Sequence, residues 1–160
     1  MLFTKTEEEI ELLRLNNDLV SKTLAEVAKI IRPGITTKEL DRRAEEFIRD
    51  NGAKPGFLGY NGYPATLCTS VNDSVVHGIP SSYALRDGDI VSVDCGTFLH
   101  GFYGDSAFTF AVGEVKPEVQ RLLNVTRECL GKGVEAAVDG LRVGDISYAV
   151  QTHAEINGYS

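Results

Sequence analysis

Apolar side chains at helical spacing mark the first third of the chain. One stripe runs from Ile10 to Ile31, directly after a capping-box sequence at Thr6–Glu9, and Pro33-Gly34 follows it. A second capping box, Thr36–Glu39, opens another amphipathic stretch that stops at Asn51-Gly52. The pattern therefore predicts two helices before the first strand.

The middle of the chain has extended spacing instead. Ala65–Ser70 and Ser74–His77 flank a turn-like pair of residues and predict a first hairpin. Ile90–Phe98 and Phe102–Val112 predict a second, longer hairpin. Because these hairpins follow a run of helices, the pattern predicts an α+β fold in which antiparallel hairpins pack against helices.

Two more helices are predicted after the hairpins, over about 117–138 and over Asp145–Ile156. The second helix lies within Asp139–Tyr159, a segment that aligns without gaps with Pro33–Ala53 and shares its final Asn-Gly. This echo predicts an internal duplication of a helix–helix–hairpin–hairpin unit. The alternative interpretation is two unrelated helices with similar caps.

The duplication predicts one incomplete domain. Residues 1–112 form the first repeat unit, and residues 113–160 are the helices that open the second unit. We therefore expect the chain to stop within its second, pseudo-symmetric half.

Two aspartates near the ends of the stretch Val93–Asp105, within the long hairpin, are the main candidates for chemistry. A turn at Leu99-His100 places Asp94 directly opposite Asp105, and a turn at His100-Gly101 makes them diagonal neighbours. Either turn puts both carboxylates on one face, where they repel by about 3 kcal/mol at an effective dielectric near 20. A shared proton or divalent metal ions could offset this repulsion. The alternative without a function is a pair of solvated aspartates on an open sheet face. Metal is favoured because neither strand supplies a basic residue, although two carboxylates are too few ligands for a pair of ions.

The composition of the chain argues against some classes of binding partner. The net charge of −7 argues against a general nucleic-acid binder, and no apolar run is long enough to span a bilayer. The acidic N-terminus does not look like a signal peptide. The 3 cysteines are widely spaced, which fits reduced thiols better than a disulfide framework. We expect a cytoplasmic protein that binds neither nucleic acid nor membrane.

Four motifs resemble one family. Asp94–Asp105, D-C-G-T-F-L-H-G-F-Y-G-D, resembles the first metal-binding hairpin of the pita-bread metallopeptidases. Cys68–Pro80, C-T-S-V-N-D-S-V-V-H-G-I-P, more specifically resembles type I methionine aminopeptidases, and Tyr60–Pro64 and Leu85–Asp94 add to the match. The resemblance covers essentially the whole chain. The aspartate pair alone would be shared with prolidase and aminopeptidase P relatives.

The resemblance implies a pita-bread fold and a site with two divalent ions, which could be Co, Mn, Fe, Zn or Ni. It makes Asp94 and Asp105 metal ligands. His77, which its spacing alone would make a structural histidine, becomes a catalytic residue that contacts substrate near the scissile amide. The walls of a pocket for the methionine side chain are implied to be Phe57, Tyr60, Tyr63 and Cys68.

The implied activity is removal of N-terminal methionine from nascent proteins and peptides. The family's remaining ligands, one histidine and two glutamates, have no match here, so we expect the chain alone to be inactive. The full-length form is expected to associate with the ribosome, and the isolated chain with itself. The alternatives are a prolidase-like or aminopeptidase P-like peptidase and a non-catalytic peptide-binding module.

Overall fold

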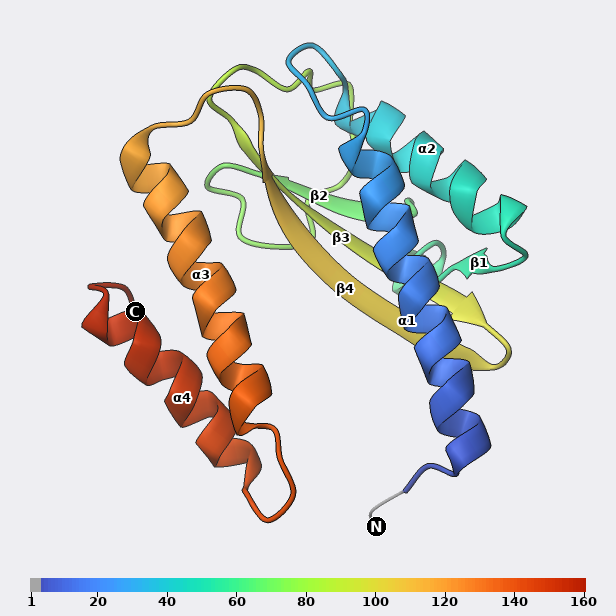
Figure 1. Ribbon diagram of the computed structural model, residues 1–160. Coiled ribbons are helices and arrows are strands. Elements are labelled where there is room, and N and C mark those ends of the chain that lie inside the picture. The colour runs from blue at the N-terminus through green and yellow to red at the C-terminus, as the bar shows by residue number, and fades with distance from the viewer. Residues whose placement is uncertain (1–3) are drawn as a thin grey trace. The chain divides into compact units, whose positions relative to one another are not determined.

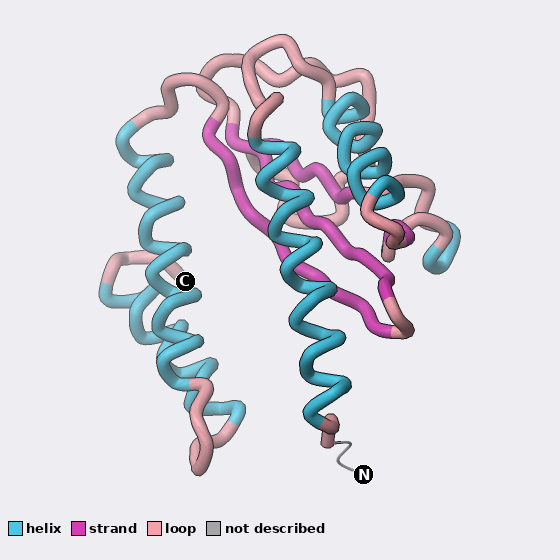
Figure 2. The backbone as a smooth tube through the Cα atoms, turned by 45° about the vertical axis from the view of Figure 1, so that its right-hand side comes forward, coloured by secondary structure: helices cyan, strands magenta, loops and turns pink. Residues whose placement is uncertain are grey.

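The chain forms two compact units in the structure, a computed structural model that describes residues 4–160 (Figures 1 and 2). The first unit ends at Val115 and the second spans Lys116–Ser160. None of the helices among the described residues is long and apolar enough to cross a membrane.

The first unit begins with α1, Glu7–Ala28, and α2, Thr37–Asp50, and both helices open at the predicted capping boxes. At α1 the Glu9 amide donates to Thr6 Oγ1 at 3.2 Å, and the Thr6 amide donates to Glu9 Oε2 at 2.9 Å. The same reciprocal pair opens α2. Each box satisfies two amides that a helix start leaves unpaired, so both starts are predicted correctly.

The first helix ends earlier than its apolar stripe predicts. Ala28 is its last residue, and Ile31 packs against the core from outside the helix. The Gly34 amide donates to the Leu85 carbonyl oxygen at 2.7 Å, and the Leu85 amide donates to the Ile35 carbonyl oxygen at 2.8 Å. The chain therefore leaves the helix to pair with a segment that is distant in sequence.

The sheet is built around β3, Ile90–Leu99. β4, Phe102–Ala111, pairs with β3 along its whole length, which confirms the predicted long hairpin. β2, Leu67–Val71, and β1, Lys54–Pro55, pair with successive parts of the opposite edge of β3. All these pairings are antiparallel.

The predicted first hairpin is wrong. β2 pairs with β3, and Ser74–His77 lies in a loop. His77 has a φ of +59°, which an ordinary strand does not allow, and the Thr69 amide donates to the Gly78 carbonyl oxygen at 2.7 Å. The extended spacing of this segment therefore comes from a loop that folds back on β2. The spacing also missed β1, which is only 2 residues long.

Helices α1 and α2 cover one face of the sheet (Figure 1). Val91, Val93 and Cys95 alternate along β3 and are fully buried in the core beneath the helices. Phe108, opposite Val93 on β4, is 48% exposed, so the core face is less completely covered on β4 than on β3. The sheet face that carries Asp94 points away from these helices.

A buried asparagine joins α1 to the hairpin. The Asn16 amide group donates to the Phe102 carbonyl oxygen at 2.7 Å and to the Thr97 carbonyl oxygen at 3.4 Å, and the Thr97 hydroxyl donates back to Asn16. Asn16 and Thr97 are 0% exposed. Gly104 permits this close approach, because a Cβ there would lie 3.1 Å from the Asn16 backbone.

The second unit is a helical pair, α3, Pro117–Ala136, and α4, Val143–Ile156. The His153 ring lies 2.8 Å from Glu128 Oε2, and Arg121 donates to the Asn157 carbonyl oxygen at 2.7 Å. Both predicted helices are present. The duplication itself stays a prediction.

Candidate metal and substrate site

The turn of the long hairpin decides how the aspartates face one another. His100 and Gly101 have φ values of 52° and 86°, as a two-residue turn with both central residues in the left-handed region requires. Leu99 therefore pairs with Phe102, and Gly96 pairs with Asp105. Asp94 lies two residues from Gly96 on the same strand, so the carboxylates are diagonal neighbours on one face.

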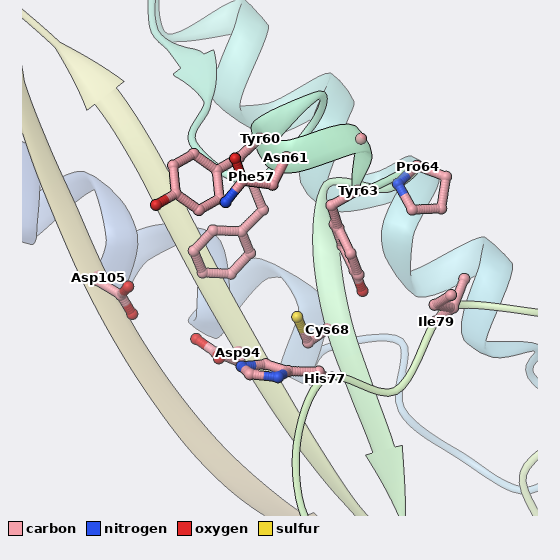
Figure 3. Close-up of a pocket in the computed structure, with 11 residues that line it drawn as sticks. Phe57, Tyr60, Asn61, Tyr63, Pro64, Cys68, His77, Ile79, Asp94 and Asp105 are labelled. Atoms are coloured by element: carbon pink, nitrogen blue, oxygen red, sulfur yellow. The ribbon is translucent and has the colours of Figure 1, made fainter.

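This face forms one wall of a cavity of about 590 Å³ (Figure 3). All seven residues singled out by the sequence line it, although they come from three strands and two loops. The cavity is lined by Phe57, Tyr60, Asn61, Gly62, Tyr63, Pro64, Cys68, His77, Ile79, Asp94 and Asp105. Its size falls within the range typical of small-ligand sites.

Four of these residues were missed by sequence reasoning. Asn61 and Gly62 belong to a short helical turn, η1, Tyr60–Gly62, in which Asn61 has a φ of 47°. Pro64 and Ile79 line the outer part of the wall. The first three lie within the Tyr60–Pro64 motif and Ile79 lies within the Cys68–Pro80 motif, so these two motifs were the signal available.

The two carboxylates create an electrostatic cost. Burial, followed by the charge of Asp105, raises the pKa of Asp94 to about 6. Asp94 Oδ1 is buried and has no hydrogen-bond partner among residues 4–160. Neither β3 nor β4 carries a lysine or arginine that could offset the repulsion. A buried carboxylate oxygen that lacks a hydrogen-bond partner and lies beside a second carboxylate could coordinate a divalent cation, because such cations bind oxygen ligands.

The described residues do not make up a complete metal site. Among residues 4–160, no group of three or more His, Cys, Asp or Glu side chains could hold an ion. Asp94 and Asp105 are therefore two donors that need further ligands.

Hydrogen bonds join the residues near the two ends of the loop that carries His77. The Asn72 side chain donates to Asp89 Oδ1 at 2.9 Å, and the Tyr83 hydroxyl donates to Asp89 Oδ2 at 2.9 Å. The Ile90 amide donates to Asn72 Oδ1 at 3.0 Å. His77 lies near enough to Asp94 for its charge to lower the pKa of that carboxyl, against the larger effect of burial. The left-handed backbone of His77 costs roughly 1–3 kcal/mol, which the surrounding contacts must offset.

The apolar wall depends on glycine. A Cβ on Gly96 would lie 2.4 Å from the Phe57 ring, so the ring rests on the sheet where a side chain is missing. The Gly56 amide donates to the Gly96 carbonyl oxygen at 2.7 Å and holds the Phe57 segment there. Burial raises the pKa of Tyr63 well above its usual range and also raises that of Cys68, so both side chains are neutral at pH 7.

A family model described as Metallopeptidase family M24 matches residues 11–160. The chain belongs to this family. The M24 chain is 49% identical over 160 residues to a methionine aminopeptidase of Clostridium perfringens, and the match covers 100% of the chain and 64% of that relative. It is 47% identical to methionine aminopeptidase 1 of Bacillus subtilis, with the same shares covered. The M24 chain thus spans 64% of the length of these relatives.

Solved structures agree on the fold. Methionine aminopeptidase from Rickettsia prowazekii superposes with a TM-score of 0.98 at 38% identity, over 100% of the M24 chain and 64% of that protein. Prolidase from Pyrococcus furiosus superposes with a TM-score of 0.87 at 23% identity, over 97% of the M24 chain and 44% of that protein, which shows the fold alone. The predicted α+β pita-bread class is confirmed.

Proposed function

We propose that the M24 chain carries the substrate pocket and two metal ligands of a methionine aminopeptidase, which removes methionine from the N-termini of nascent proteins and peptides. The observation that carries this proposal is the cavity that joins two carboxylates to an apolar wall. The 49% identity to a methionine aminopeptidase supports it over the prolidase-like alternative, which rests on structures such as one that is 23% identical.

Asp94 and Asp105 would hold divalent metal through their carboxylate oxygens. The resemblance implies two ions, drawn from Co, Mn, Fe, Zn and Ni. Bound metal supplies Lewis-acid polarisation of the scissile carbonyl and lowers the pKa of water. The buried, unpaired Oδ1 of Asp94 supports a metal-facing role for this oxygen.

The remaining residues orient the substrate. The His77 ring would hydrogen-bond to the peptide near the scissile amide, at the end of the cavity next to Asp94. Phe57, Tyr63 and Cys68 present neutral surface that suits a flexible, apolar methionine side chain. Tyr60, which is 68% exposed, would close the mouth of the pocket over the substrate.

The 160-residue chain alone should turn over little substrate. Two carboxylates cannot complete a two-metal site, and the described residues offer no third ligand beside them. We propose that the missing ligands come from the part of the family sequence that this chain does not cover.

The test compares the chain with a chimaera that adds, after Ser160, the part of the Bacillus subtilis relative beyond the matched region. Both proteins are incubated with Mn²⁺ or Co²⁺ and a Met-Ala-Ser peptide, and free methionine is measured. We expect turnover from the chimaera only. Asp94→Asn should abolish it, while Asp50→Asn, an exposed carboxylate at the end of α2, should not.

Other outcomes would contradict the proposal. Turnover by the purified chimaera that persists unchanged in Asp94→Asn would contradict the role of Asp94 as a metal ligand. Cleavage of Ala-Pro in place of Met-Ala would favour the prolidase alternative. Peptide binding that is unaffected by a chelator, without turnover, would favour a non-catalytic binding module.

The proposed partners are nascent polypeptide N-termini and peptides in the cytoplasm, with the full-length form acting at the ribosome. We also propose that the isolated chain self-associates, because large apolar side chains of its helical pair are exposed, including Leu130, Val134 and Ile156. Size-exclusion chromatography at two concentrations tests this, and an unchanged monomer would contradict it.

A further inference from the structure

Gly78, which directly follows His77, is held by hydrogen bonds at both its backbone amide and its backbone carbonyl group. The Gly78 carbonyl oxygen accepts from the Thr69 amide at 2.7 Å and from the Tyr63 hydroxyl at 3.2 Å. The Gly78 amide donates to Ser70 Oγ at 3.1 Å. We call this arrangement of Tyr63, Thr69 and Ser70 around Gly78 the Gly78 clamp.

The clamp depends on a very close approach of two backbones. A Cβ on Gly78 would lie 2.3 Å from the Thr69 carbonyl oxygen and 3.0 Å from Ser70 Cα. Ser70 is only 4% exposed, so its hydroxyl faces the Gly78 amide from a site with little access to water. The hydroxyl therefore acts on the loop and not on a ligand in the cavity.

Tyr63 divides its roles between ring and hydroxyl. The ring lines the cavity, while the hydroxyl lies 2.9 Å from the Leu67 carbonyl oxygen and 3.2 Å from that of Gly78. One O–H proton is thus shared between two backbone carbonyls. Because this proton is committed to the protein, the hydroxyl is not free to donate a hydrogen bond to substrate.

The residue next to the clamp has an unfavourable backbone. His77 has a φ of +59°, a region that side-chain-bearing residues adopt only when their surroundings enforce it. The Ser70 hydroxyl holds the peptide immediately after His77, and Tyr63 and Thr69 hold the next one. Figure 3 shows the His77 ring beside Asp94 and Cys68 at the end of the cavity.

We propose that Ser70 and Tyr63 are positioning residues for His77: their hydroxyls hold the backbone amide and the backbone carbonyl of Gly78, so that the imidazole faces the cavity beside Asp94. This inference rests on the proposed function, in which His77 contacts substrate. It adds two residues whose hydroxyls act on the reaction only through His77.

The first experiment measures the clamp directly by NMR on the 160-residue chain. Ser70→Ala should speed hydrogen exchange of the Gly78 amide by about three- to tenfold, as loss of one hydrogen bond predicts, and should move the ¹³C shifts of His77 away from left-handed values. Ser70→Thr, which keeps the hydroxyl, should restore both signals. Ser92→Ala, on the residue that pairs with Ser70 across the sheet, is the matched control and should change neither.

The second experiment measures kinetics in the chimaera. Ser70→Ala and Tyr63→Phe should each lower kcat by about three- to tenfold with little change in KM, because the pocket walls remain. In a His77→Ala background neither substitution should lower kcat further, since the clamp then has nothing to position. If Ser70→Ala does not fold, the same double-mutant cycle can be measured with Tyr63→Phe and His77→Ala.

Equal losses of kcat with and without His77 would overturn the proposal, as would unchanged Gly78 exchange in Ser70→Ala. A chimaera that is inactive with the unmodified sequence refutes the proposed function instead. The NMR result then still decides whether the clamp sets the conformation of His77, so the two failures are distinguishable.

Discussion

Replacing Asn16 with alanine should loosen the support of the aspartate-bearing hairpin. Asn16 lies on α1, and its side chain bonds to both strands of the hairpin at Thr97 and Phe102. The substitution removes every one of these bonds. The partner groups on the hairpin then stay buried, because Thr97 and the site of Asn16 are both 0% exposed.

The expected loss of unfolding free energy is about 3 kcal/mol. The bonds to Phe102 and from Thr97 contribute about 1 kcal/mol each, and the 3.4 Å contact contributes less. A buried carbonyl left without a partner adds a further cost of about 1 kcal/mol or more. Asn17→Ala is the matched control, because this exposed neighbour bonds only to Leu13 of its own helix, and it should cost about 0.5 kcal/mol or less.

Urea unfolding of the chain, followed by circular dichroism, measures these losses. Thr97→Val removes one partner of the network, so Asn16→Ala should cost about 1 kcal/mol less in that background than in the unmodified chain. A loss from Asn16→Ala no larger than that from Asn17→Ala would refute the reasoning. Strict additivity of the Asn16 and Thr97 substitutions would refute the claim that they form one network.

Three further predictions follow from the site and the helix starts. Burial and Asp105 raise the pKa of Asp94 from 3.8 to about 6, so the metal-free chain should lose stability as the pH rises through this window. In the presence of a chelator, the unfolding free energy of Asp94→Asn should therefore equal that of the unmodified chain below pH 3.8. Above pH 6 the variant should be about 1–2 kcal/mol more stable, a figure already reduced for solvent screening. A gain in stability that does not vary with pH would contradict this. Gly96→Ala should displace the Phe57 ring and raise the KM of the chimaera for Met-Ala-Ser about tenfold. Gly131→Ala is the control, because Gly131 has open space around it, and it should leave KM unchanged. Equal KM values for the two variants would contradict the prediction. Thr36→Ala should remove the cap of α2 and cost about 1 kcal/mol in urea unfolding, and a loss near zero would show that the cap is dispensable.

Local chemistry made much of the fold predictable. The two capping boxes mark helix starts because side-chain oxygens three residues apart meet the first free amides. The alternation along Ile90–Leu99 predicted a strand with one buried face. The segment Ser74–His77 was misread because its extended spacing is also that of a loop that lies against a strand, and spacing carries no information about which backbone it will contact.

The residues of the candidate site could be predicted from the sequence, but their arrangement in space could not. Motifs named Asp94, Asp105 and His77, and the alternation of strand faces placed the two carboxylates together. The turn at His100-Gly101, which makes them diagonal and not directly opposed, was one of two turns that the sequence allowed. The roles of these residues stay predictions until metal and substrate are tested.

The helix starts, the long hairpin and the family can be read from the printed residues alone, because each depends on residues close together in the chain. The contact of Gly78 with β2, the packing of Phe57 on Gly96 and the bonds of Asn16 to the hairpin are visible only in the folded structure. These contacts join residues that are distant in sequence at sites where a missing Cβ or a single amide permits close approach. Their partners are set by packing, which no local pattern records.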